Sequence, residues 1–391
     1  MRVIHAFNVP RSGSGSTAAS LATIAALRDH EGVETQVFSR SSRELPAGFA
    51  GRARAGVSAF YPAGAVRDFR QALASFRPDL VHVNELFPLI SPWILRACRE
   101  AAVPVVMTID DYHPTCPIRS HFRDGHVCTE CLGGREWRAV ANNCRGSLAE
   151  SSVNALYNAM VRKLGMITGF VDQFISPSDF TGGWAVRHAG VPADRMSTVN
   201  PAVRLPPAPS DAGAGSYIAF AGRFVPEKGV HVLLEAARRT SLPVRLSRSA
   251  AHSASVELPP DVEVVITRDR DELDAFYRGA RMLVVPSIWF DSFPTVGLEA
   301  MAHGIPVIGS RIGGLPEIVA EGVDGELFEA GNAAELASKA AALWADPPRC
   351  RAMGAAARAK ALARWGAASH ARGVMQVYER ALRGRRAAAS P

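Results

Sequence analysis

A strand-to-helix junction at residues 217–229, YIAFAGRFVPEKG, carries the strongest fold signal in this sequence. The apolar run Tyr217–Ala221 predicts a buried strand, and a helix is expected to begin near Lys228. The loop between them carries two cations, Arg223 and Lys228. Strand, loop and helix in this order are the unit that builds a parallel sheet, so the stretch favours an α/β fold.

The same alternation continues on both sides, around a stretch at 200–215 whose proline and glycine content is typical of a linker. It predicts strands at 2–8, 33–38, 80–83, 104–109, 173–177, 244–246, 262–266, 282–286 and 306–308, and helices at 16–30, 68–76, 92–101, 148–164, 228–239, 271–279, 295–303, 334–345 and 367–382. We therefore expect two Rossmann-like, doubly wound parallel-sheet domains, at 1–205 and 206–366, that face a cleft. The segment 367–391 is expected to form a helix that packs back on the first domain.

Composition argues against several classes of protein. The 391 residues carry a net charge of +7 but no basic stripe with interleaved aromatic residues, so we expect no nucleic-acid partner. No run approaches the roughly 20 apolar residues of a membrane span, and the apolar start at Met1–Phe7 is too short for a signal peptide. We therefore expect a cytoplasmic protein. Its basic excess reflects either a codon bias toward arginine or a surface for anionic substrates or the inner membrane face.

Arg223 and Lys228 are candidate ligands for a diphosphate. A helix N-terminus favours phosphate through its unpaired N–H groups and its dipole. Arginine adds a planar fork for phosphate oxygens, and lysine adds a point charge. Such a pair would bind a diphosphate and stabilise it as a leaving group. From the spacing alone, a turn with two solvated cations is equally compatible with these residues.

A second candidate segment is PSIWFDSFPTVGLEAMA at residues 286–302. Asp291 lies in the expected loop, and Glu299 lies more than one turn inside a helix that starts near Pro294. Apolar neighbours surround Glu299, and a buried glutamate needs hydrogen-bond partners, which ribose hydroxyls could supply. The alternative is an N-capping aspartate with an exposed glutamate.

Together these segments resemble glycosyltransferase family 4, a GT-B family of retaining enzymes. The match includes GIPVI at 304–308 and GGLPE at 313–317. The resemblance implies that Arg223 and Lys228 bind the donor diphosphate, that Glu299 binds the donor ribose, and that Asp291 is directed toward the sugar. It also implies that the backbone amides of Phe293, Thr295 and Val296 line the sugar and phosphate site. The sequence differs from the family pattern in having Asp291 in place of glutamate and Pro294 in place of glycine.

The N-terminal half matches the same family in two places. Residues 13–17, GSGST, resemble the glycine loop whose backbone approaches the donor, which implies donor contacts at Gly15 and Ser16. Residues 106–112, VMTIDDY, resemble a strand that ends in Thr-x-His-Asp. The histidine of that pattern contacts the donor sugar or lies near the reacting centre, and Asp110 occupies its position. We expect Asp110 to replace it as an acceptor of hydrogen bonds, or the enzyme to bind a different sugar.

Residues 110–147 interrupt the alternation and contain four cysteines, at positions 116, 128, 131 and 144. The spacing suits a structural zinc held by Cys116, Cys128, Cys131 and Cys144. A similar insert occurs in a subset of the family, and buried thiols or a disulfide pair are the alternatives.

Asp269-Arg270-Asp271 spells the DxD pattern that other glycosyltransferases use to hold a divalent metal. Because Asp271 opens an apparent helix, we interpret it as a cap and expect no catalytic metal.

The resemblance predicts transfer, with retention, of a sugar from a nucleotide-diphosphate sugar to an acceptor. The acceptor could be a polysaccharide, a lipid-linked glycan or a small molecule. Two alternatives remain open: a nucleotide-sugar 2-epimerase of GT-B fold, and a non-catalytic protein that binds sugar nucleotides. The first would isomerise the donor without an acceptor, and the second would bind it without turnover.

Overall fold

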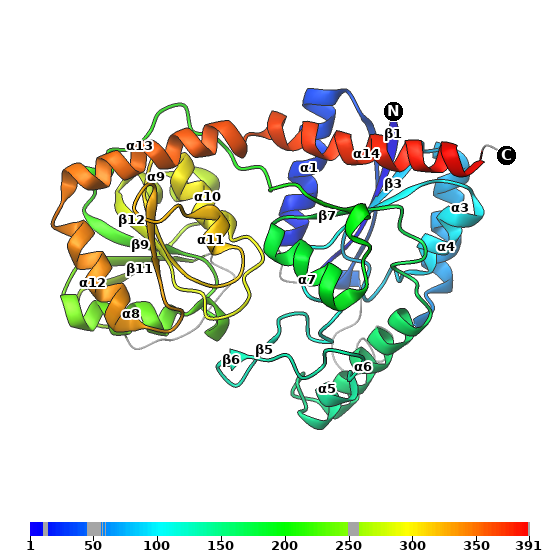
Figure 1. The fold of residues 1–391 in the computed structure, drawn as a ribbon, viewed down its shortest axis with the longest axis horizontal. Coiled ribbons are helices and arrows are strands. Elements are labelled where there is room, and N and C mark those ends of the chain that lie inside the picture. The colour runs from blue at the N-terminus through cyan, green and yellow to red at the C-terminus, as the bar shows by residue number, and fades with distance from the viewer. Residues whose placement is uncertain (11–14, 45–55, 57, 59, 249–257, 390–391) are drawn as a thin grey trace. The chain divides into compact units, whose positions relative to one another are not determined.

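The computed structural model describes all residues except 11–14, 45–55, 57, 59, 249–257 and 390–391 (Figure 1). The described chain divides into two compact units. Unit 1 comprises Met1–His121, Thr129–Ala202 and Ala367–Pro391, and unit 2 comprises Phe122–Cys128 and Val203–Gly366. Apart from the short segment Phe122–Cys128, the chain enters unit 2 at Ala202/Val203, slightly before the expected boundary at 205/206. Among the described residues, no helix combines the length and the apolar character that a membrane span requires.

Unit 1 is built on a six-stranded sheet whose strands all run parallel, in the order β2-β1-β3-β4-β7-β8. The strands are β1 (Arg2–Val9), β2 (Glu34–Ser41), β3 (Leu80–Val83), β4 (Val105–Thr108), β7 (Gln173–Ser176) and β8 (Met196–Thr198). β8 was not expected, because the strand has only three residues and two of them are polar. The central strands β1, β3 and β4 are the apolar runs that the sequence indicates.

Helices cover both faces of this sheet. On one face, α3 (Ala63–Phe76), α4 (Trp93–Glu100) and α6 (Leu148–Lys163) share an apolar core with the strands. On the other face, α1 (Gly15–Glu31) and α14 (Ala367–Ala389) pack side by side, where Val374, Val377 and Tyr378 are fully buried (Figure 1). A helix that the sequence analysis missed, α7 (Asp179–Ala189), begins at an N-cap formed by Ser178 and ends at Gly190.

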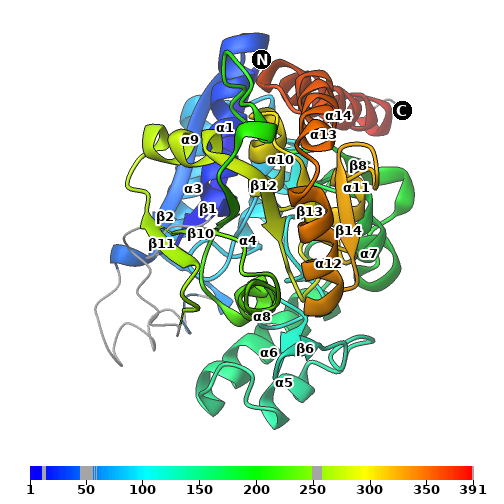
Figure 2. The same ribbon diagram turned by 90° about the vertical axis from the view of Figure 1, so that its left-hand side faces the viewer.

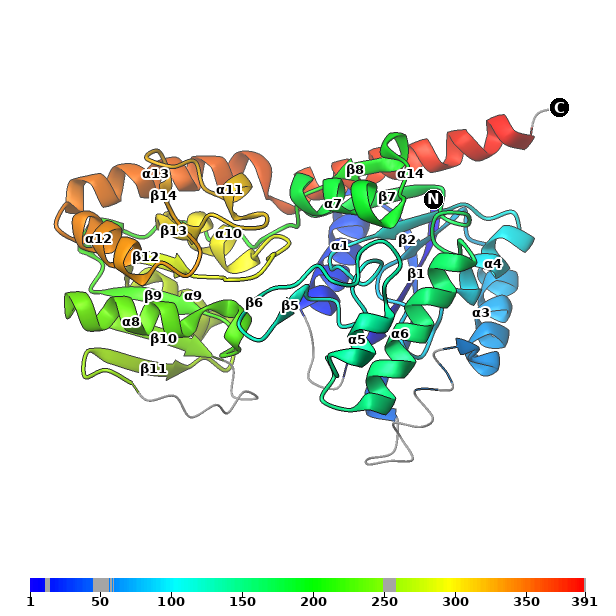
Figure 3. The same cartoon turned by 60° about the horizontal axis from the view of Figure 1, so that its bottom comes forward.

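The insert at 110–147 is more ordered than its composition suggests. It contains a short hairpin, β5 (Phe122–Arg123) with β6 (His126–Val127), and the helix α5 (Trp137–Ala141). Figure 3 shows α5 lying beside α6, and an ion pair between Glu136 and Arg162 joins them at 2.6 Å. Ser147 caps α6 by accepting a hydrogen bond from the backbone N–H of Glu150.

Unit 2 is built on a second parallel sheet, in the order β11-β10-β9-β12-β13-β14 (Figure 2 and Figure 3). The strands are β9 (Tyr217–Ala221), β10 (Val244–Arg248), β11 (Val262–Ile266), β12 (Ala280–Val285), β13 (Val307–Ser310) and β14 (Gly325–Phe328). Alternate residues of β9 enter different cores: Ile218 and Phe220 face one side, and Tyr217 and Ala219 face the other.

Each of these cores is closed by its own helices. α8 (Val230–Thr240) and α12 (Ala333–Trp344) cover one face of the sheet. α9 (Arg270–Arg278), α10 (Thr295–Ala302) and α11 (Leu315–Ile318) cover the other. α13 (Pro347–Arg364) follows and contributes to both cores, with Met353 in one and Ala357 in the other.

The segment that enters unit 2 is fastened to that unit. The backbone N–H of Val203 donates to the carbonyl oxygen of Trp365 at 2.9 Å, so the start of the segment Val203–Gly366 is hydrogen-bonded to a residue next to its end. Arg358 of α13 donates to the carbonyl oxygen of Pro206 at 2.6 Å and to that of Ala302. Trp365 is fully buried.

Candidate active site

In unit 2, two loops meet at the carboxyl edge of the sheet because β9 and β12 are neighbours. Lys228 does not begin the helix as expected: it ends a 3₁₀ turn, Pro226–Lys228, and α8 starts at Val230. Gly229 between them has φ +67°, and a Cβ there would overlap the carbonyl oxygen of Pro286. Only glycine allows this close approach, which brings the Lys228 loop onto the segment after β12.

Lys228 and Asp291, from the two predicted motifs, form an ion pair. Lys228 Nζ donates to Asp291 Oδ2 at 2.6 Å, and Ser287 Oγ donates to the same oxygen at 2.9 Å. The Asp291 side chain is only 6% exposed, and that of Lys228 is 22% exposed. The ammonium also lies 5.3 Å from the centre of the Trp289 ring. A buried carboxylate thus positions the cation that was expected to bind the diphosphate.

Glycines also fix the backbone around Asp291. Gly313 has φ +60°, and a Cβ at Gly313 or at Gly314 would overlap the backbone of Asp291 or Ser292, respectively. The N–H of Gly314 donates to the carbonyl oxygen of Asp291 at 2.8 Å. The two glycines of the GGLPE motif therefore clamp the loop that carries Asp291.

Arg223 and the start of α10 complete the edge of unit 2. Arg223 follows Gly222, which has φ +148°, and its side chain is exposed. Within the described parts of the chain, no hydrogen bond or ion pair of Arg223 is recorded. α10 begins at Thr295, and Pro294, which lacks an N–H, is its N-cap. The first amides of a helix lack partners within it, so those of Thr295 and Val296 are available to an anion, whereas the Phe293 side chain is buried against Trp365.

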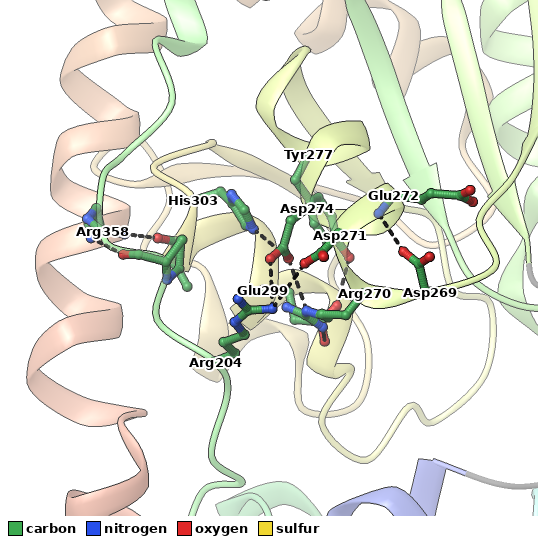
Figure 4. Close-up of polar contacts among 12 residues, drawn as sticks. Arg204, Asp269, Arg270, Asp271, Glu272, Asp274, Tyr277, Glu299, His303 and Arg358 are labelled. Atoms are coloured by element: carbon green, nitrogen blue, oxygen red, sulfur yellow. Dashed lines mark hydrogen bonds and ion pairs between the residues drawn. The ribbon is translucent and has the colours of Figure 1, made fainter.

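Glu299 is partly buried and held from two sides (Figure 4). Arg270 Nη1 donates to its Oε1 at 2.7 Å, and the Tyr277 hydroxyl donates to its Oε2 at 2.9 Å. The expectation that Asp271 caps a helix is wrong. Asp269 is the N-cap of α9 and accepts from the N–H of Glu272 at 2.9 Å, because the helix begins one residue earlier than the apolar pattern indicated.

In unit 1, Asp110 lies at the corresponding edge, after β4, and accepts a hydrogen bond from Ser16 in the first turn of α1. The neighbouring strand β3 leads to Glu85, which pairs with Arg119, and Arg119 also lies 3.6 Å from Asp111. Burial and the charge of Asp111 raise the pKa of Asp110 to about 7. Asp110 can therefore carry a proton near neutral pH.

Glu85, Asp110, Asp111 and Arg119 line a pocket within unit 1 of about 450 Å³, including space open to solvent. Of the residues that line it, Asn84 and Glu85 directly follow β3. Thr108 is the last residue of β4, Asp110 lies two residues further on, and His113 belongs to the insert. The structure brings Ser16 to Asp110, a contact that the sequence analysis did not predict. Gly15 is the first residue of α1, whereas Gly13 and Ser14 lie outside the described residues.

The zinc site expected from Cys116, Cys128, Cys131 and Cys144 is not found. Among the described residues, which include all four cysteines, no group of three or more histidine, cysteine or acidic side chains is placed to hold a metal. Cys116 is buried, and burial raises the pKa of its thiol. Cys128 belongs to the hairpin segment that clusters with unit 2, while the other three belong to unit 1. Sequence spacing alone could not reveal this division.

Sequence reasoning missed several residues of these two edges. Glu85 follows β3 as Asp110 follows β4, so the rule that ligands bind beyond the carboxyl ends of parallel strands could have identified it. Arg270, Asp274 and Tyr277 recur at helical spacing on one face of α9, which was a usable signal. Nothing local indicated Ser287 as a partner of Asp291.

Comparisons with known proteins identify the family of this chain. The protein-family model described as "Glycosyltransferase Family 4" matches residues 14–205, and the family model described as "Glycosyl transferases group 1" matches residues 210–360. A D-inositol 3-phosphate glycosyltransferase of Streptomyces bingchenggensis is 30% identical over 317 residues, 69% of this chain and 67% of the relative. A GDP-mannose-dependent alpha-mannosyltransferase of Corynebacterium glutamicum is 26% identical over 292 residues, 73% of this chain and 63% of the relative. The chain spans about half to two thirds of the length of such relatives.

Solved structures share the fold. Sucrose-phosphate synthase of Thermosynechococcus elongatus superimposes with a TM-score of 0.74 at 19% identity, covering 98% of this chain and 100% of the other. The Anabaena protein HepE, in complex with UDP, superimposes with a TM-score of 0.65 at 17% identity, covering 97% and 100%. With the two parallel-sheet units, these likenesses establish the GT-B architecture. The chain is a member of glycosyltransferase family 4.

Proposed function

We propose that this chain transfers a sugar, with retention at the anomeric carbon, from a nucleotide-diphosphate sugar to an acceptor hydroxyl. The observation that carries the proposal is the cationic edge of unit 2, where Lys228 is fixed by Asp291 and Arg223 is exposed after β9. Retention is the outcome that the family resemblance implies. It needs no base on the protein when the acceptor attacks the face from which the diphosphate leaves.

Each residue of this edge has a defined part in the proposed reaction. Lys228, Arg223 and the first amides of α10 hold the diphosphate and neutralise the charge that develops as the glycosidic bond breaks. Asp291 positions the Lys228 ammonium, and Glu299 receives the ribose hydroxyls. Because Asp291 holds the Lys228 ammonium and α10 holds its first amides before the reaction, these hydrogen-bonding groups need little reorganisation in the transition state.

UDP-sugars are the first donors to test, because structures of the fold relative HepE hold UDP and UDP-glucose. GDP-mannose is the second, from the printed name of the Corynebacterium relative. The acceptor belongs to unit 1, where the pocket around Glu85 and Asp110 presents carboxyl groups that can accept hydrogen bonds from a polyol. Inositol phosphates are acceptors to include, since they appear in the names of several relatives.

The experiment measures release of nucleoside diphosphate from each donor, with and without acceptors, and determines the anomeric configuration of the product by NMR. Acceptor-dependent release with a retained configuration supports the proposal. Isomerised donor formed without acceptor would establish the 2-epimerase instead. Tight donor binding without turnover on any acceptor would favour a non-catalytic binding protein.

A further inference from the structure

The carboxylate of Glu299 is bound on both oxygens by side chains of one helix, α9. Arg270 Nη1 lies 2.7 Å from Oε1, and the Tyr277 hydroxyl lies 2.9 Å from Oε2. Positions 270 and 277 are two turns apart and therefore face the same side of the helix. A carboxylate offers about four acceptor positions. Two positions remain for a ligand after the two contacts from α9.

A second carboxylate fixes Arg270 in turn. Asp274 is one turn further along α9, its side chain is only 8% exposed, and its Oδ1 lies 3.0 Å from Arg270 Nε. Asp274 also lies 3.2 Å from Arg204 Nη1 and 3.3 Å from His303 Nε2 (Figure 4). A buried carboxylate persists only with such partners. Asp274 therefore holds Arg270 between two acids and ties α9 to α10 and to the entering segment.

From this geometry we propose that Arg270 and Tyr277 are positioning residues for recognition of the donor ribose, acting through Glu299. The inference rests on the proposed function, in which Glu299 receives the ribose hydroxyls. Both side chains hold the carboxylate in one orientation before ligand arrives, so no side-chain freedom is lost on binding. Asp274 contributes to this positioning because its ion pair with Arg270 restrains the guanidinium.

A purely structural role for Arg270 and Tyr277 predicts a different result from a positioning role. A structural role would make Arg270 variants less stable but would leave their preference among nucleotides unchanged. A positioning role predicts that the variants lose the preference for a ligand that carries ribose hydroxyls over one that lacks them. The ratio of two dissociation constants measured on one protein separates these cases, because general loss of folded protein affects both ligands equally.

The test uses isothermal titration calorimetry of the full chain with UDP and with 2′,3′-dideoxy-UDP. If the wild type binds GDP more tightly than UDP, GDP and its dideoxy analogue replace them. We expect the wild type to prefer the ribose form about tenfold or more, because hydrogen bonds to a charged carboxylate are lost in the analogue. We expect R270Q to reduce this preference to about twofold and R270K to restore part of it.

A matched control and a milder variant keep the test decisive. R278Q makes the same substitution at an exposed position of α9 and should retain the wild-type preference. Y277F keeps the bulk of the ring and removes only the hydroxyl, so it should lower the preference even if R270Q fails to fold. An unchanged preference in folded R270Q or Y277F overturns the inference. A wild type that binds neither UDP nor GDP refutes the proposed function itself, which is a distinguishable result.

Discussion

Replacing Arg223 by alanine removes an exposed cation for which no intramolecular contact is recorded in the described chain. We therefore expect the melting temperature to stay unchanged. We expect turnover to fall about a hundredfold, because loss of one charged hydrogen bond to the leaving diphosphate costs on the order of 3 kcal/mol of transition-state stabilisation. Arg223→Ala is thus a test of catalysis that folding does not confound.

Replacing Lys228 by alanine should have two effects, because Lys228 also neutralises a buried acid. The Asp291 carboxylate, 6% exposed, would keep Ser287 as a partner but lose the ammonium at 2.6 Å. Loss of a hydrogen bond to a charged group should cost about 2 kcal/mol of unfolding free energy. For a unit of this size that lowers the melting temperature by about 4–8 °C. Turnover should fall as in Arg223→Ala.

The assay pairs steady-state release of nucleoside diphosphate with thermal unfolding followed by circular dichroism. The double variant Lys228→Ala/Asp291→Asn supplies the control, since it removes both charges of the buried pair. It should recover most of the stability and none of the turnover. Wild-type rates in both single variants would refute the assignment of the diphosphate site. An unchanged melting temperature in Lys228→Ala would refute the role of the ion pair in stability.

Three further predictions address the frame around the sites. Gly229→Ala should lower the unfolding free energy by more than about 1 kcal/mol and abolish turnover, because φ is +67° and a Cβ would overlap the carbonyl oxygen of Pro286. Urea unfolding measures the change in unfolding free energy. Tyr378→Phe leaves the buried His82 Nδ1 without its partner at 2.7 Å, and should cost about 1–3 kcal/mol by the same method. The raised pKa of Asp110, about 7, favours folding while the group is protonated, and that contribution is lost as pH rises from about 4 to 7. Asp110→Asn should therefore stabilise the protein more at pH 8 than at pH 5, and equal gains at both values would contradict the reasoning.

The sequence predicted the strands best where apolar runs were short and bounded by turns. β9 and β11 match the expected 217–221 and 262–266, because apolar residues mark both strands, although β9 is fully buried and β11 is buried only at Val262. α13 was missed because its buried face is made largely of small residues, including Gly354, Ala357 and Ala361, which give little apolar periodicity. A Cβ at Gly354 would overlap the carbonyl of Gly304, so small residues are required there.

The candidate site was predictable in its members but not in its contacts. Arg223, Lys228, Asp291 and Glu299 were identified from two motifs, each of which runs from a strand end into the helix that follows. Their partners come from long-range packing: 63 positions separate Lys228 from Asp291, and 29 separate Arg270 from Glu299. Local patterns carry no information on such pairs, because strand order decides which loops meet.

Unit 1 is completed by residues on both sides of unit 2, and this has a consequence for the newly made chain. During synthesis, residues 203–366 leave the ribosome before α14, so the sheet of unit 2 can close first. Until α14 has been synthesised, the face of β1, β3 and β4 that it covers is not packed against Val374, Val377 and Tyr378. That face therefore remains an exposed apolar surface. The nascent N-terminal unit therefore exposes apolar surface, and needs protection from aggregation, until α14 has been synthesised.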